Sequence, residues 1–190
     1  MPSILITGVG GQGTLLASRV IGNAAIREGY DVKVSEVHGM SQRGGSVETF
    51  VRFSKGKVQS PIIDEGGADI LLAFEILEAC RSLGVLRRGG ELIANTQEIS
   101  PMPVISGQAK YPEGLVESLE AMDIKLRTVD ALSLAIEAGS PKAVNVVLIG
   151  LLSKSLDFDL ETWRLAISES APARFLEANL KAFELARAAG

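Results

Sequence analysis

The segment SILITGVGGQGTLLASRVIG (Ser3–Gly22) joins a short apolar run to a glycine cluster and then to a helix-like pattern. The run SILIT is β-branched and apolar on both faces, which is typical of a fully buried strand. From Gly13 to Ile26 the apolar residues recur at helical spacing, and Gly29 suits a helix C-terminus. A second strand-like run, YDVKVSEV, follows. These elements predict a β–α–β unit with parallel strands and a right-handed crossover.

The remainder of the chain continues to alternate between strand-like and helix-like runs. We expect buried strands in ADILLAF, GGELIANT and DIKLRTVD, and two further strands, VETFVRFS and KVQSPII, around a turn at KG. Helices dominate the last third, including PKAVNVVLIGLLSKSL with Pro141 in its first turn. No repeat or domain-sized linker interrupts the pattern. The sequence therefore predicts a single domain, 1–190, with a Rossmann-like, doubly wound α/β fold, a mostly parallel sheet and a helical C-terminal extension.

Composition excludes several classes of function. The chain has 190 residues and a formal charge of −4, with 19 Lys+Arg against 23 Asp+Glu and no basic block. Because phosphate-backbone binding needs clustered positive charge, nucleic acid is not an expected partner. The N-terminus lacks a signal-type segment, and the apolar run AVNVVLIGLL is far shorter than the roughly 20 residues that a membrane helix needs. We therefore expect a soluble, cytoplasmic protein without a membrane partner.

The glycine cluster matches a nucleotide-binding fingerprint. Gly8, Gly10 and Gly13 fit the pattern G-x-G-x-x-G, with Gly11 inside the same turn. Glycines allow the backbone to approach a phosphate closely, and the helix that follows offers free N–H groups. Glu36 lies at the end of the next predicted strand, where a ribose-binding acid would sit. The alternative is that the glycines serve only tight strand–helix packing and that Glu36 is a solvated acid.

Other features of the chain do not fit a free-standing dehydrogenase. Such an enzyme needs a proton donor and a substrate pocket, but the chain has one histidine, His38, and no separate substrate domain. The single cysteine, Cys80, lies among helical apolar residues and is expected to be an inert core thiol. We find no Ser/His/acid pattern and no cluster of metal ligands. The sequence thus predicts no catalytic residue and no metal site on this chain.

A second glycine-containing loop gives the sequence a more specific resemblance than the glycine fingerprint alone. The run EVHGMSQRGGSVETFVRF (Glu36–Phe53), together with GVGGQGTLLASRV, resembles the gamma-type subunits of the 2-oxoacid:ferredoxin oxidoreductases. The resemblance continues through PIIDEGGADILLAFEILEACR and NTQEISPMPVISGQAKYP and covers nearly the whole chain. The loop HGMSQRGG keeps the arginine and two glycines of the family's loop and favours the branch that acts on indolepyruvate.

The resemblance implies an accessory role in a larger enzyme. The holoenzyme would oxidatively decarboxylate an aryl 2-oxoacid such as indolepyruvate, form an acyl-CoA and pass electrons to ferredoxin. Thiamine diphosphate, Mg²⁺ and the [4Fe-4S] clusters would lie on the large (alpha) subunit. This chain has one cysteine and no Gly-Asp-Gly…Asn signature for a thiamine diphosphate–Mg²⁺ site. We therefore expect no cofactor on it, no activity from it alone and an exposed interface through which the isolated chain can self-associate.

We expect the two glycine loops to converge at the carboxyl edge of the parallel sheet. There they would contact coenzyme A or line the entrance to the thiamine site, with Arg43 as a fork for phosphate or carboxylate. The alternative for Arg43 is a structural ion pair across the subunit interface. The predicted cofactor-binding residues are Gly8, Gly10, Gly11, Gly13, Ser41, Gln42, Arg43 and Gly44.

Two competing functions remain open from the sequence. One is a stand-alone NAD(P)- or FAD-binding oxidoreductase built on the glycine loop, which tight NADH binding by the isolated chain would favour. The other is a ligand-free scaffold domain that only stabilises its partner.

Overall fold

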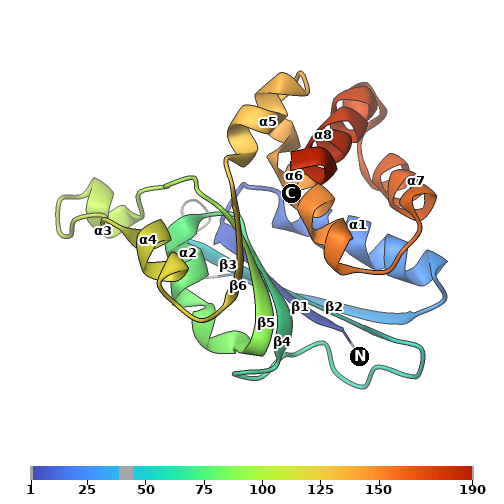
Figure 1. Cartoon of the computed structure of the whole chain (residues 1–190), viewed down its shortest axis with the longest axis horizontal. Helices are drawn as coiled ribbons and strands as arrows, with labels where there is room; N and C mark the ends of the chain where they lie inside the picture. The colour runs from blue at the N-terminus through green and yellow to red at the C-terminus, as the bar shows by residue number, and fades with distance from the viewer. Residues whose placement is uncertain (1, 39–44, 190) are drawn as a thin grey trace.

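The protein is described by a computed structural model that covers residues 2–38 and 45–189. One mixed sheet forms its centre, with the strand order β2-β3-β1-β4-β5-β6 (Figure 1). The strands are β1 (Ser3–Val9), β2 (Asp31–His38), β3 (Ser46–Ser54), β4 (Ala68–Ala73), β5 (Leu86–Asn95) and β6 (Lys125–Val129). The helices are α1 (Thr14–Arg27), α2 (Ile76–Arg81), α3 (Met102–Ile105), α4 (Leu115–Glu120), α5 (Ala131–Glu137), α6 (Val144–Leu152), α7 (Leu160–Ser170) and α8 (Leu176–Ala189).

The expected fold class is confirmed, but the neighbour of β1 differs from the prediction. Strands β1, β4, β5 and β6 pair in parallel, whereas β3 pairs antiparallel with both β1 and β2. The predicted β–α–β unit is therefore split, because β3 lies between β1 and β2. Burial explains the order: Val51 and Phe53 of β3 are fully buried, while β2 is largely exposed and takes the edge.

The predicted strand at KVQSPII is wrong. Residues 57–63 form an irregular connection between β3 and β4. Its carbonyls at Ser60 and Ile62 accept hydrogen bonds from the guanidinium of Arg52, at 3.2 and 2.8 Å. Pro61 has no N–H to donate to a ladder, and the side chain of Arg52 takes the place of a neighbouring strand.

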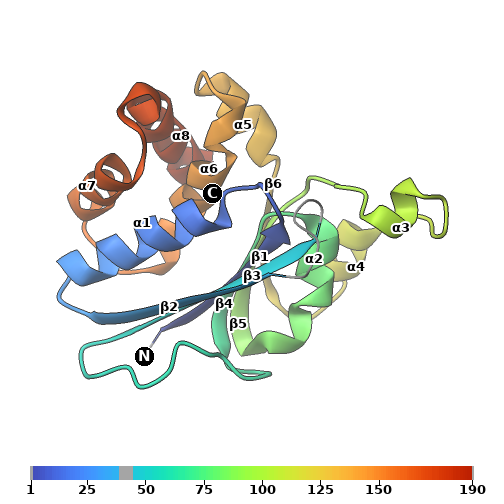
Figure 2. The ribbon, with the colours of Figure 1, turned by 180° about the vertical axis from the view of Figure 1, so that it is seen from behind.

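Helices cover both faces of the sheet. The helical C-terminal extension, α5 to α8, packs with α1 on one face, and α2 and α4 pack on the other (Figures 1 and 2). Helix α6 is buried all round, so it forms the centre of the larger core. A Cβ atom at Gly150 would lie 2.7 Å from the Cβ of Ala186, so this glycine allows the close contact of α6 with α8.

The chain changes direction across the sheet at β1. Helix α1 leads to the β2–β3 side, whereas β4 lies on the opposite side of β1. Open α/β sheets place ligands at such a switch point, outside the carboxyl ends of the strands. A ligand site is therefore expected where β1 and β4 end. In the described part of the chain, no helix has the length and apolar character needed to span a membrane.

Candidate functional site

The glycine loop between β1 and α1 has the geometry that only glycine adopts without strain. Gly11 and Gly13 have φ values of 98° and 86°, in the left-handed region. Gly13 also caps the N-terminus of α1, and as a glycine it offers no side-chain hydrogen bond to the first N–H groups of that helix. A Cβ atom at Gly13 would lie 2.7 Å from Nδ2 of Asn145, so the loop and α6 are in direct contact.

Two side-chain amides hold the carboxyl edge of the sheet in place. Oε1 of Gln12 accepts from the backbone N–H of Val9 at 2.8 Å, and its Nε2 donates to the carbonyl of Phe74 at 2.9 Å. The same carbonyl accepts from Nδ2 of the buried Asn95 at 3.1 Å. Oδ1 of Asn95 accepts from the N–H of Ala131 at 3.2 Å, at the start of α5. The ends of β1, β4 and β5 are thus tied to one acceptor.

A cavity of about 410 Å³ opens beside this framework. The glycine loop forms one wall, the segment that follows β5 forms another, and the starts of α5 and α6 complete it. Its lining residues are Gly11, Gln12, Gly13, Gln97, Ile99, Leu132, Pro141, Lys142, Val144 and Asn145.

The free polar groups of this cavity are hydrogen-bond donors. The N–H groups of Gly11 and Gly13 donate to no acceptor among the described residues. Asn145 is 5 % exposed, and its Oδ1 already accepts from the backbone of α6, while its Nδ2 has no acceptor within residues 2–38 and 45–189. Lys142 adds an ammonium group that faces the Phe175 ring at 5.6 Å and forms no ion pair in the described structure. A cavity lined by a cation and by free N–H groups is suited to binding an anion such as a phosphate.

The predicted glycines of the first loop have three different roles. Gly11 and Gly13 line the cavity, and their part in cofactor binding stays a prediction. Gly8 serves packing, since a Cβ atom there would lie 2.9 Å from both Oε1 of Gln12 and Cβ of Phe74. The N–H of Gly10 donates to the carbonyl of Gly45 at 3.0 Å and ties the loop to the residue before β3.

The second predicted loop lies outside the described residues. Ser41, Gln42, Arg43 and Gly44 belong to the 39–44 segment, and their predicted part in the site stays a prediction. The described residues that follow them lie close to the first loop. Gly45 contacts Gly10, and the hydroxyl of Ser46 donates to the buried Glu78 at 2.6 Å. The start of β3 is therefore tied to the first loop and to α2, while the convergence of the two loops stays a prediction.

Glu36 does not stand where a dinucleotide fold needs its ribose-binding acid. It lies on the edge strand β2, and β3 separates it from β1 and the glycine loop. Its carboxylate accepts from the hydroxyl of Thr49 at 3.2 Å and lies 3.0 Å from Nε2 of His38. The arrangement disfavours a dinucleotide spanning the loop and this acid.

Cys80 is not an activated thiol. Burial, and then the negative charge of Glu75, raise the pKa of the Cys80 thiol. A raised pKa leaves less of the thiolate that acts as nucleophile or metal ligand. The described residues also contain no group of three or more His, Cys, Asp or Glu side chains placed to hold a metal ion.

Four polar residues of the cavity were not predicted as site residues: Gln12, Gln97, Lys142 and Asn145. Asn145 carried a usable signal, because it is the one polar residue of α6, which is otherwise apolar and buried. Such a residue is expected to meet a polar partner or a ligand. Lys142 and Gln97 lie in short connecting segments, where the sequence shows no periodic pattern.

A projecting arm, residues 97–114, starts at the cavity wall and carries α3 away from the body of the protein (Figures 1 and 2). The buried carboxylate of Glu75 anchors its two ends. It accepts from the N–H of Ile99 at 3.0 Å and from the hydroxyl of Tyr111 at 2.5 Å. Burial and the bond to Glu75 raise the pKa of the Tyr111 phenol, which keeps its proton and remains a donor.

We expect Tyr111→Phe to loosen this arm. Loss of a hydrogen bond to a charged group should lower stability by about 1.5–3 kcal/mol and speed amide exchange of residues 98–112. Hydrogen exchange read by mass spectrometry measures both the site and the size of the change. Tyr30→Phe is the matched control, because Tyr30 packs against Phe53 without a hydrogen bond from its hydroxyl in the described structure. Equal protection of the arm in wild type and Tyr111→Phe would contradict the anchoring role.

A family model described as pyruvate ferredoxin/flavodoxin oxidoreductase matches residues 3–189. The chain belongs to this family. It is 45% identical over 190 residues to the indolepyruvate oxidoreductase subunit IorB of Thermococcus kodakarensis, which covers 96% of this chain and 93% of that relative. The resemblance predicted from the two glycine loops is therefore confirmed.

Solved structures of family members share the fold. The gamma subunit of a keto/oxoacid ferredoxin oxidoreductase from Geobacter sulfurreducens matches 98% of this chain and 96% of its own, with a TM-score of 0.72 and 23% identity. A 2-oxoglutarate:ferredoxin oxidoreductase from Magnetococcus marinus, solved with 2-oxoglutarate, coenzyme A and succinyl-CoA bound, gives a TM-score of 0.75 and 21% identity. It aligns with 98% of this chain but with 30% of the longer neighbour. The same domain architecture thus occurs both as a separate subunit and within a longer chain.

Proposed function

We propose that this chain is the small subunit of an indolepyruvate-type 2-oxoacid:ferredoxin oxidoreductase and that its glycine-loop cavity binds phosphate groups of coenzyme A. The observation that carries the proposal is the donor set of the cavity: free N–H groups at Gly11 and Gly13, the amide of Asn145 and the ammonium of Lys142. The identity to the small indolepyruvate oxidoreductase subunits supports the choice of enzyme.

Coenzyme A fits the cavity in part. Its diphosphate can lie against the glycine loop, with the α1 N-terminus and Lys142 opposing its charge. A cavity of about 410 Å³ is too small to enclose the whole molecule, so the remainder must extend over the neighbouring surface. The bound cofactor would supply the thiol that accepts the acyl group. The role of this chain is to hold and orient the phosphate end.

The large subunit is the proposed partner and carrier of thiamine diphosphate, Mg²⁺ and the [4Fe-4S] clusters. The single cysteine of this chain is partly buried and has a raised pKa, which does not suit cluster ligation. Ferredoxin would reach the complex through the cluster-bearing subunit. Met102 and Ile105 are more than half exposed on the projecting arm, which starts at the cavity wall. We place the large subunit over this arm, where it would meet the reactive end of coenzyme A.

Anaerobic coexpression with the large subunit tests the proposal. We expect the two chains to copurify and to convert an aryl 2-oxoacid with coenzyme A to acyl-CoA while reducing ferredoxin. Each chain alone should be inactive. Stoichiometric NADH binding by this chain, together with failure to retain the large subunit, would instead support a stand-alone oxidoreductase.

A further inference from the structure

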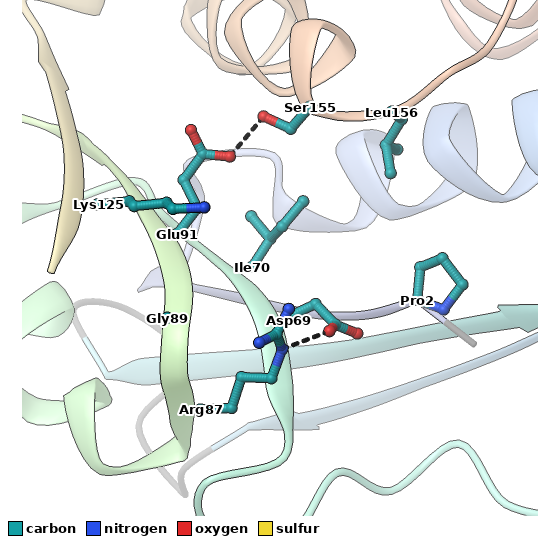
Figure 3. Close-up of a pocket in the computed structure, with 9 residues that line it drawn as sticks. All are labelled: Pro2, Asp69, Ile70, Arg87, Gly89, Glu91, Lys125, Ser155 and Leu156. Carbon is teal, nitrogen blue, oxygen red and sulfur yellow. Dashed lines mark hydrogen bonds and ion pairs between the residues drawn. The ribbon is translucent and has the colours of Figure 1, made fainter.

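A second cavity, of about 370 Å³, lies at the opposite edge of the sheet, where β4, β5 and β6 begin (Figure 3). The glycine loop lies at the carboxyl ends of the parallel strands, so the two cavities are separate. The lining residues are Pro2, Asp69, Ile70, Arg87, Gly89, Glu91, Lys125, Ser155 and Leu156.

Neighbouring residues on β4, β5 and β6 form the floor of this cavity. Ile70 pairs with Glu91, and Glu91 pairs with Lys125, so these neighbours on β4, β5 and β6 project from the same face. Figure 3 shows Lys125 extending across β5 toward Ile70. Leu156 and Pro2 lie on the other side of Ile70 and complete an apolar surface.

The acidic groups of the cavity are already satisfied. Glu91 accepts from Nε of Arg127 at 2.7 Å and from the hydroxyl of Ser155 at 2.6 Å. Asp69 accepts from Nε of Arg87 at 2.6 Å and from the first N–H of β1 at 2.8 Å. Each acid is therefore neutralised by an arginine and has its second oxygen occupied.

Lys125 is the one charged residue lining the cavity that has no partner among the described residues. Its ammonium forms no ion pair or hydrogen bond with the described residues. The two arginine–acid pairs cancel, and the cavity keeps one net positive charge beside an apolar floor. A monoanion would neutralise that charge. A dianion such as phosphate would leave one negative charge in the cavity without a compensating cation.

We propose that this cavity binds a small monocarboxylate with an aromatic body. Its carboxylate accepts from Nζ of Lys125, and its ring packs against the half-buried Leu156 and Pro2, over the small part of Ile70 that is exposed. The volume exceeds the need of a bare anion and leaves room for one ring system. This site is independent of the proposed coenzyme A site, because it uses other residues at the opposite edge of the sheet.

Titration of the full-length ¹⁵N-labelled chain with phenylacetate tests the site. We expect saturable amide shifts at Gly89 and Ser155, with Gly11 and Gly13 unchanged. Acetate lacks the ring and phenylacetamide lacks the charge, so each should bind on the order of tenfold or more weakly. Lys125→Met should weaken phenylacetate binding by a similar factor, and Lys125→Arg should restore it. Lys142→Met, in the other cavity, is the matched control and should leave the shifts unchanged.

Three outcomes would overturn the proposal. They are phenylacetate binding that Lys125→Met leaves unaltered, equal affinity for acetate or inorganic phosphate, and shifts confined to the glycine loop. Failure of acyl-CoA formation in the assembled enzyme would count against the proposed function and leaves this titration unaffected, so the two can fail separately.

Discussion

An assembled enzyme carrying Lys142→Glu is expected to show a rise of about 10- to 100-fold in KM for coenzyme A. Lys142 is the one cation that lines the glycine-loop cavity in the described structure. Reversing its charge removes a charge-assisted contact to phosphate and adds a repulsion. Because Lys142 would hold the phosphate end and not the reacting thiol, kcat at saturating coenzyme A should change little. Steady-state acyl-CoA formation at varied coenzyme A measures both constants.

A matched variant separates this effect from overall charge. Lys57→Glu makes the same change at an exposed position of the 55–67 connection, outside both cavities. It should leave KM for coenzyme A unaltered. An intact Lys142→Glu complex with wild-type KM would rule out this cavity as the phosphate site.

The largest stability effect is expected at Trp163. Its side chain is fully buried and packs between Phe158 and Phe183, with ring centroids 5.6 and 6.4 Å away. Trp163→Ala should lower the free energy of unfolding by about 3–5 kcal/mol, because it removes a large apolar group and leaves a cavity. Urea denaturation followed by circular dichroism gives the value.

Trp163→Phe is the informative control. The indole Nε1 is buried and has no hydrogen-bond partner among the described residues. A phenyl ring keeps most of the packing and removes a donor that is costly to bury, so the two effects oppose each other. We expect Trp163→Phe to lose much less stability than Trp163→Ala. Equal losses for the two variants would show that the N–H finds a partner in solution.

The sequence predicted the fold class and the family but not the order of the strands. Hydrophobic pattern locates β3 correctly, yet pattern is local and does not state that β3 lies between β1 and β2. That position follows from its burial, which only the assembled sheet defines. The error at 57–63 has a related cause, since alternating apolar residues indicate a strand whether or not a ladder is available.

Only one wall of the candidate site, the glycine loop, could be predicted from the sequence. Gly11 and Gly13 are visible as a motif because their unusual backbone conformation requires glycine. Asn145 lies more than a hundred residues away in the chain and reaches Gly13 through the packing of α6. Contacts of this kind depend on tertiary packing and leave no short motif. Glu36 shows the reverse case, in which correct spacing along the chain does not bring a residue to the loop.

The carbonyl of Phe74, which two side chains share, restricts movement of the domain near the glycine loop. This carbonyl accepts hydrogen bonds from both Gln12 and Asn95. The carboxyl edge of the sheet therefore has little freedom to close around a ligand. The glycine loop and the strand ends are ordered when the chain folds, so ligand binding carries little further entropic penalty for ordering them. Any movement that opens and closes the site during turnover would then occur in the large subunit, while this chain stays rigid.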